Sequence, residues 1–219
     1  MKDSLIITHY KKRAYYYFFL LSIISYLLHG ISFGSEFDQI KKIETYLNGI
    51  QSFEADILQI DPYGNETTGS IKLKKPGKLR IEYNDPKADH LILASNGVLV
   101  VIDYKSNTEP LRYPINETPL KYLSNQNLDL RNQAIDFKIY TSENEVALEL
   151  KEIERSLSSG RIVLYFATDP ISITGWEIPI NTNQSTKIIL ENLILNSELS
   201  DDLFYVSAEL MKFYNKMNN

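Results

Sequence analysis

The sequence predicts an α+β fold that is mostly β: a single large curled antiparallel sheet, preceded by an N-terminal helix and interrupted by short helices. The chain has 219 residues, of which 43% are hydrophobic and 23% charged, and this composition is typical of a globular protein. Apolar and polar residues alternate in about ten short segments, and short turns connect nearly all of them. We expect so large a sheet to curl, because neighbouring strands twist relative to one another.

Residues 1–34 have the layout of a secretory signal peptide. Three basic residues at 11–13 precede an apolar stretch over residues 14–28, and small residues occupy the −3 and −1 positions before the bond between Gly34 and Ser35. We therefore expect cleavage at this bond and one domain over residues 35–219. The alternative is an uncleaved membrane anchor, but a membrane-spanning helix needs about 20 apolar residues and this stretch contains serines and tyrosines.

An amphipathic helix is predicted at the start of that domain. Ser35 begins a capping pattern, and apolar residues then recur at steps of three and four as far as Gly49. A two-residue period follows and predicts strands over residues 53–59, 69–74 and 79–83, each with one apolar face. Those faces carry Phe53, Ala55, Ile57, Ile71, Leu73, Leu79, Ile81 and Tyr83.

A hairpin is predicted over residues 91–102. Asn96 and Gly97 suit a type I′ turn, which needs a positive φ at both central positions. Leu91 and Leu93 fall on one face of the hairpin, and the opposite face is apolar as well. We therefore expect both faces to be covered and the hairpin to lie at the centre of the sheet.

The strand pattern lapses between residues 108 and 133. Thr118 and Pro119 are typical of a helix start and predict a short helix as far as Leu123, and a second short helix is expected over residues 128–133. Strand patterns then resume, and a short helix is expected near the end of the chain. The strands are expected over residues 137–140, 146–151, 161–166, 173–178 and 186–195, and the helix over residues 207–217.

Charge and cysteine content argue against several classes of partner. The formal net charge is −5 and the predicted domain carries no large basic cluster, so nucleic acid is not expected as a partner. The chain has no Cys, so it holds neither a disulfide nor a lipid-modified cysteine. The basic run over residues 72–78 fits the solvated face of a strand that leads into a turn.

The sequence shows no catalytic constellation. His90 is the only histidine of the predicted domain, and no second His or Cys is available there to complete a zinc site. A Gly-x-Ser-x-Gly motif at residues 30–34 coincides with the predicted cleavage site, not with the strand-to-helix turn that a hydrolase needs. We therefore expect a protein that is not an enzyme and that holds no metal and no cofactor.

The apolar face of the curled sheet is the remaining candidate site. Short movable helices over an apolar concave surface describe a binding site for an apolar ligand. The alternative is that these helices simply complete the core, because residues that line a pocket and residues that line a core look alike in sequence.

The order of motifs along residues 37–205 resembles the LolA family of periplasmic outer-membrane lipoprotein carrier proteins. Each motif is weak alone, but the ordered set at these spacings is specific. The motifs are Phe53-x-Ala-x-Ile-x-Gln59, the segment from Gly69 to Tyr83 with its Lys-Lys-Pro-Gly, Asp85-Pro86, Asn96-Gly97, Asp103, Thr118-Pro119-Leu120, Gly175-Trp176 and Leu203-Phe204.

This resemblance implies an unclosed β-barrel of ten to eleven strands with a helical lid and a cavity for the acyl chains of lipoproteins. It implies a monomeric periplasmic chaperone that receives acylated lipoproteins from an ABC-type transporter in the inner membrane. The carrier then delivers them to an acceptor at the outer membrane. The expected cavity residues are Phe53, Ile57, Ile71, Leu73, Leu79, Ile81, Tyr83, Leu91, Leu93 and Trp176.

The resemblance also implies a latch that closes the lid. The family usually has Arg directly before the proline of the Lys-Pro-Gly segment, where it bonds to the lid, and this chain has Lys75 there. Lys lacks the planar fork of Arg, so we expect a weaker or differently arranged latch. Arg80 is the second latch candidate, although the strand period places it on the polar face.

Three other functions are weighed against the carrier. The outer-membrane acceptor LolB shares the fold but is itself a lipoprotein, and this chain has no Cys to carry the lipid. A periplasmic sensor or regulator, or a general lipid-binding protein, would use the same cavity. An exported esterase would need a nucleophile paired with a histidine, which the sequence does not offer.

Overall fold

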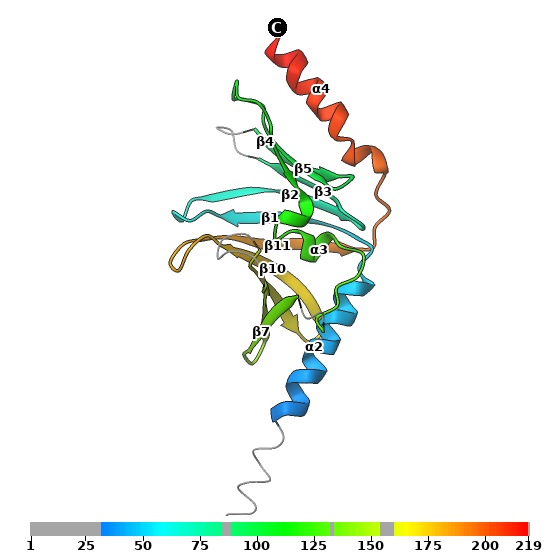
Figure 1. Ribbon diagram of the computed structural model, residues 1–219, viewed down its shortest axis with the longest axis vertical. Coiled ribbons are helices and arrows are strands. Elements are labelled where there is room, and N and C mark those ends of the chain that lie inside the picture. Colours follow the sequence, from blue (N-terminus) through cyan, green and yellow to red (C-terminus); the bar gives the residue numbers. More distant parts are fainter. Residues whose placement is uncertain (1–31, 85–88, 132–133, 154–159, 219) are drawn as a thin grey trace, which may run out of the picture. The chain divides into compact units, whose positions relative to one another are not determined.

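The computed structural model describes residues 32–84, 89–131, 134–153 and 160–218 (Figure 1). The chain divides into two compact units, residues 1–41 and residues 42–219. Helix α2 (Ser32–Gly49) crosses the boundary between them, and the sheet belongs to the second unit. The predicted signal peptide lies almost entirely outside the described residues. Among the residues that are described, no helix has the length and apolar character needed to cross a membrane.

The second unit is built on one antiparallel sheet of eleven strands in the order β6-β5-β4-β3-β2-β1-β11-β10-β9-β8-β7. The first and last strands pair with each other in the middle, and β6 and β7 form the two free edges, so the sheet is not closed. The strands are β1 (Ser52–Ile60), β2 (Glu66–Lys74), β3 (Lys78–Tyr83), β4 (His90–Ser95), β5 (Val98–Asp103), β6 (Leu111–Pro114), β7 (Ile135–Thr141), β8 (Glu145–Glu152), β9 (Ile162–Thr168), β10 (Ile171–Pro179) and β11 (Ser185–Leu195).

Helices occupy two segments outside the sheet. The 3₁₀ helix η2 (Ile115–Glu117) and the one-turn helix α3 (Lys121–Ser124) lie in the segment that joins the two edge strands β6 and β7. The 3₁₀ helix η3 (Asp201–Phe204) and helix α4 (Val206–Met217) follow the last strand. We call residues 115–131 the lid, because this segment connects one free edge to the other.

Two glycines lie where neighbouring strands approach too closely for a side chain. A Cβ atom on Gly69 would lie 2.2 Å from the Glu82 backbone oxygen, and one on Gly175 would lie 2.2 Å from the Ile188 backbone oxygen. Gly69 is on β2 and Gly175 on β10, so they flank the central pair β1 and β11 on either side. The absence of a side chain therefore permits tight coiling of the sheet at both places.

The pairing register defines two faces of the sheet. We call the face that carries Phe53 and Ala55 the inner face and the other the outer face. The part of helix α2 that belongs to this unit packs on the inner face, where the Tyr46 ring meets the Phe166 ring edge-on at 6.2 Å between centroids. The Tyr46 hydroxyl also accepts a hydrogen bond from the backbone N–H of Ile173 at 3.1 Å.

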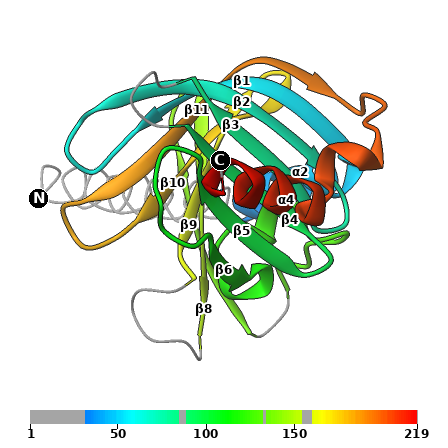
Figure 2. The same ribbon diagram turned by 90° about the horizontal axis from the view of Figure 1, so that it is seen from above.

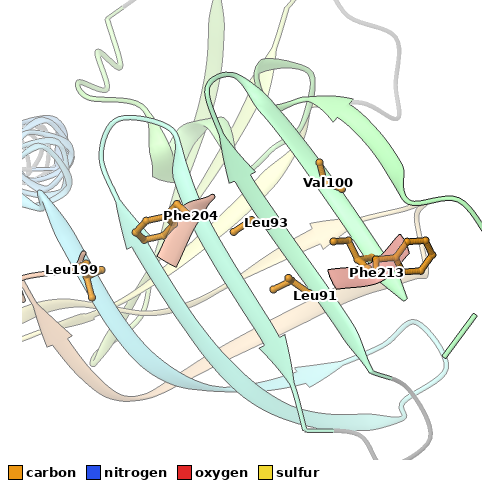
Figure 3. Packing of buried hydrophobic residues seen from close by; sticks show 7 residues of the cluster. Leu91, Leu93, Val100, Leu199, Phe204 and Phe213 are labelled. Carbon is orange, nitrogen blue, oxygen red and sulfur yellow. The ribbon is translucent and has the colours of Figure 1, made fainter. Parts of the chain in front are cut away.

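Helix α4 covers part of the outer face, across β4 and β5 (Figure 2). Phe204 and Phe213 pack there against four buried side chains of the hairpin, and Leu199 completes the cluster (Figure 3). The four hairpin residues are Leu91, Leu93, Val100 and Ile102.

The predicted fold class is confirmed: the protein is mostly β, with a single unclosed antiparallel sheet and an N-terminal helix. Asn96 and Gly97 have φ values of 51° and 81°, as the predicted hairpin turn requires. The expectation that this hairpin lies at the centre of the sheet is wrong, because β4 and β5 are next to the edge strand β6 and the central pair is β1 and β11. Two predictions between residues 108 and 133 are wrong. Residues 111–114 form the edge strand β6, and residues 128–131 contain no helix. The predicted helix from Thr118 is reduced to α3.

Candidate functional site

The inner face is largely apolar across the sheet. Paired residues form rows that run from strand to strand, because directly opposed residues share a face. One row from β1 to β6 is Phe53, Leu73, Leu79, Ala94, Leu99 and Tyr113, and the next is Ala55, Ile71, Ile81, Ile92, Val101 and Leu111. A row across the other half, from β1 to β7, is Gln59, Ile188, Trp176, Leu164, Leu148 and Ile139.

The exposure of this apolar surface rises towards the free edges. Leu73 and Ile71 in the middle are fully buried, whereas Leu111 and Tyr113 on β6 are 56% and 44% exposed. On the opposite edge, the inner-face residues Phe137 and Ile139 are half-buried. Solvent therefore reaches apolar inner-face side chains at both edges of the sheet.

The lid begins directly after the exposed edge strand β6. The backbone N–H of Ile115 donates to the Gly97 carbonyl at 3.0 Å, which fixes the start of the lid to the turn between β4 and β5. Apolar lid side chains are buried although the segment has little regular structure. They are Ile115, Tyr122, Leu123, Leu128 and Leu130.

Side chains of α2 hold the second half of the lid. The Asn48 amide pairs with Leu128 as a strand would: its Nδ2 donates to the carbonyl at 2.9 Å, and its Oδ1 accepts from the backbone N–H at 2.7 Å. The Glu44 carboxylate accepts a bond from the Leu130 N–H at 3.3 Å. These bonds satisfy backbone groups of a segment that has no sheet or helix partners of its own.

The α3 part of the lid is held by other elements. The Gly77 N–H, in the turn between β2 and β3, donates to the Ser124 carbonyl at 2.8 Å. The Lys121 ammonium group binds the Glu152 carboxylate at the end of β8. Both Lys121 and Ser124 are buried, although each is polar.

Lys75 does not bond to the lid as the resemblance implied. Its Nζ donates to the Leu47 carbonyl near the end of α2 at 2.7 Å, and its backbone N–H donates to the Gln51 carbonyl. Burial lowers the pKa of Lys75 to about 8. The contact between this turn and the lid comes instead from the backbone of Gly77.

Arg80 faces away from the lid, on the outer face. Its guanidinium donates to the Leu203 carbonyl and the Glu209 carboxylate, both at 3.1 Å, and to Glu82 at 2.7 Å. The strand period placed Arg80 on this face, but its role there is to bind η3 and α4. The expectation that Arg80 is a lid latch is wrong.

The predicted cavity residues divide between the two faces. Leu91 and Leu93 pair with Glu82 and Arg80, so they lie on the outer face under α4. The expectation that they line the same surface as Leu79 is wrong, because both faces of the hairpin are apolar and the pattern alone could not select one. The other predicted cavity residues share the inner face: Phe53, Ile57, Ile71, Leu73, Leu79, Ile81, Tyr83 and Trp176.

One polar pair interrupts the apolar inner face. The Tyr83 hydroxyl donates to the Gln59 side-chain oxygen at 2.7 Å. The intervening residue on β2 is Gly69, which pairs with Tyr83 and places no side chain between the two groups. Burial raises the pKa of Tyr83 to about 12, so this hydroxyl stays protonated at neutral pH.

The sequence interpretation missed the residues that attach the lid and the exposed edge. Asn48, Lys121 and Glu152 belong to three separate elements, and only the fold brings them to the lid. One signal was available: Lys121 is a single cation between apolar residues of a predicted helix, and such a group needs a partner when it is buried. Leu111 and Tyr113 went unnoticed because a four-residue edge strand is too short for a clear period.

The geometry is that of an apolar inner face with a lid that joins its two free edges, and comparison with known proteins identifies the family. The LolA family, described as outer membrane lipoprotein carrier protein LolA, matches residues 48–207. An outer-membrane lipoprotein carrier protein of Methylococcus capsulatus is 23% identical over 199 residues, which cover 85% of this chain and 92% of that protein.

Two solved structures are also similar. A LolA superfamily protein from Nitrosomonas europaea has a TM-score of 0.43 and 13% identity, and the match covers 77% of this chain and 98% of that one. An uncharacterized conserved protein from Thermus thermophilus has a TM-score of 0.47 and 12% identity, with 78% and 92% of the two chains covered.

Proposed function

The chain belongs to the LolA family of outer membrane lipoprotein carrier proteins, and from that premise we propose that it binds the acyl chains of lipoproteins on its inner face. One observation supports this most directly. The apolar rows of the inner face end in the exposed side chains of Leu111 and Tyr113, next to the start of the lid. An acyl chain that enters there meets apolar surface before the lid has moved.

Transfer requires that such binding be reversible. Burial of an acyl chain contributes about 0.8 kcal/mol per CH₂, so a site that enclosed the chains completely would release them very slowly. An exposed edge and a lid made of short helices limit the enclosure. The cargo then passes to whichever partner binds the acyl chains better.

The proposed route starts and ends at membranes. The carrier operates in the periplasm, accepts lipoproteins from an ABC-type transporter of the inner membrane and delivers them to an acceptor at the outer membrane. The layout of residues 1–34 supports export, and the family supports the cargo. The transporter supplies the energy for extraction, because acyl chains do not leave a bilayer readily.

A matched pair of variants tests the binding surface. Leu111 on the inner face is 56% exposed and Ile194 is 55% exposed, but Ile194 pairs with Glu54 and therefore lies on the outer face. Both are replaced by Ser, and binding of a diacylated lipopeptide is followed by the fluorescence of Trp176, the only tryptophan of the chain. The same peptide without acyl chains is the ligand control.

Leu111→Ser should weaken binding by about three- to tenfold, because less apolar surface is buried with the acyl chain. Ile194→Ser should bind like the unaltered protein, and the peptide without acyl chains should not bind. Equal effects of the two substitutions would show that the inner edge is not the entry surface. Binding of the peptide without acyl chains would exclude acyl chains as the recognised group.

A further inference from the structure

A cation and a carboxylate join the lid to the sheet at one point. Lys121 lies in α3 and Glu152 at the end of β8, and the Lys121 Nζ binds the Glu152 Oε1. The Lys121 side chain is 9% exposed and the Glu152 side chain 26%. We propose that Lys121 and Glu152 are the positioning residues of the lid: their ion pair holds α3 on the sheet, and α3 leaves when the pair separates. The purpose of this motion rests on the proposed function, whereas the motion itself does not.

The two halves of the lid are attached in different ways. Residues 128–130 are bound to α2 through neutral donors and a carboxylate acceptor, and both Leu128 and Leu130 are buried. The α3 half also buries two apolar side chains, Tyr122 and Leu123, but its polar attachments are one backbone bond from Gly77 and the ion pair. The residues between the halves, 125–127, are exposed. This arrangement places the moving part at α3 and the hinge at residues 125–127.

The Lys121 ammonium group is also held by an aromatic ring. It lies 5.1 Å from the centroid of the Tyr122 ring, within the range of a cation–π interaction. The ring belongs to the lid itself and moves with Lys121. The contact therefore keeps the cation on the lid side, and Glu152 is the partner that α3 leaves behind on β8.

An ion pair suits a lid that must open as well as close. Removal of one partner from a buried pair is strongly destabilising, because the remaining charge has no compensation. Separation of the intact pair is different, since both ions regain their hydration on exposure. An apolar contact of the same size would instead expose apolar surface to water. The pair thus fixes the closed position without making the open position prohibitive.

Hydrogen exchange of the backbone amides measures this opening without any cargo. We compare three variants: Lys121→Met, Glu152→Gln and the double variant Lys121→Glu/Glu152→Lys, in which the two charges are swapped. The control variants are Lys138→Met and Glu145→Gln, which make the same changes of charge at exposed positions on β7 and β8. The amides of α3 report the lid, and those of β1 report the stability of the sheet.

Each single variant should raise exchange in α3 at least about tenfold, with β1 unchanged. The charge-swapped double variant should partly restore slow hydrogen exchange in α3, and both control variants should behave like the unaltered protein. Exchange in α3 that stays at the original rate in both folded single variants would overturn the proposal. An increase that appears equally in β1 would also overturn it, because the pair would then support the whole fold.

Salt provides a second measurement on the unaltered protein, which remains informative if the variants do not fold. High salt stabilises separated charges, so exchange in α3 should rise between about 0.05 and 1 M NaCl while β1 stays constant. No salt effect on α3 would contradict the proposal. If the lid responds as expected but no acylated peptide binds, the positioning role stands and the proposed function fails.

Discussion

The Glu209 carboxylate of α4 lies 3.1 Å from the Arg80 guanidinium of β3, and this pair fixes the C-terminal helix to the outer face. The two side chains are 10% and 13% exposed. Tyr104 and Lys212 donate to the same carboxylate at 2.6 and 2.9 Å. Burial by itself raises the pKa of Glu209, but the bonds from Tyr104, Lys212 and Arg80 outweigh it and hold the pKa below its ordinary value.

Acid should therefore release α4 from the outer face. A carboxylate whose pKa is lower in the folded protein stabilises the fold above the ordinary pKa of Glu, about 4.3, and this contribution is lost as the pH falls below it. Glu209→Gln should lower the free energy of unfolding by about 1–3 kcal/mol at pH 7. The measurement is urea unfolding of both proteins at pH 7 and near pH 3.

The control is Glu198→Gln, which removes a charge from an exposed position. The difference between Glu209→Gln and the unaltered protein should shrink at the lower pH, because the stability that a lowered carboxyl pKa contributes is lost progressively as the pH falls below the ordinary pKa of Glu. A difference that is the same at both pH values would show that charge on Glu209 does not hold the helix.

Much of the fold followed from the sequence because each strand keeps a strict two-residue period. Phe53, Leu73 and Leu79 were assigned to one face from alternation alone, and the pairing register agrees. Alternation failed at the β4–β5 hairpin, where Leu91 and Ile92 are both apolar. The side that α4 covers depends on residues more than 100 positions further along the chain, such as Phe204 and Phe213.

The attachment of the lid was beyond reach for the same reason. Lys75 was assigned from its position before a proline, but its side chain reaches the carbonyl group of Leu47 in α2. The partner of a long flexible side chain is set by the neighbours that tertiary packing supplies. Local sequence identifies the donor, and only the fold identifies the acceptor.

The two close-approach glycines should not tolerate a methyl group. Gly69→Ala and Gly175→Ala each place a Cβ atom 2.2 Å from a backbone oxygen of the next strand. The backbone cannot move aside as a flexible side chain does, so we expect each substitution to lower the free energy of unfolding by about 3 kcal/mol or more. The measurement is thermal unfolding. Gly49→Ala is the matched control, since no atom beyond its chain neighbours and its own helix backbone lies within 4 Å of a Cβ at that position. A similar loss there would contradict the steric explanation.

Alkaline pH should strengthen the contribution of Lys75. Burial lowers its pKa to about 8 in the folded protein, while an unfolded chain titrates near 10.4. Between these values the unfolded state binds more protons, so the stability contributed by Lys75 rises with pH. Since Lys75 is only half-buried, we expect a gain of about 1 kcal/mol relative to Lys75→Met between pH 7 and 9.5.

Urea unfolding of the two proteins at both pH values measures this gain. The comparison cancels the effects of the tyrosines, which both proteins share. Lys138→Met is the control, because it removes an exposed lysine. A constant difference between Lys75→Met and the unaltered protein across this range would show that the ammonium group is not shielded from water.

The Asn48 amide should decide how firmly the second half of the lid is closed. Asn48→Ala removes both hydrogen bonds to Leu128 and leaves the Leu128 backbone groups without those partners. The free energy that favours the closed lid should fall by about 1–2 kcal/mol. Asn48→Asp keeps the acceptor for the N–H, but it places a carboxylate against the Leu128 carbonyl. The loss should therefore be at least as large in Asn48→Asp as in Asn48→Ala.

Hydrogen exchange at the Leu130 amide measures this loosening, because its N–H is bonded to Glu44 when the lid is closed and the substitutions leave that bond in place. Exchange through a transiently opened segment follows the population of the open form. A change of 1–2 kcal/mol corresponds to about five- to thirtyfold faster exchange at Leu130 in both variants. Asn107→Ala, at an exposed position before β6, should leave this exchange at the original rate. Unchanged exchange in Asn48→Ala would mean that burial of Leu128 and Leu130 alone keeps the lid closed.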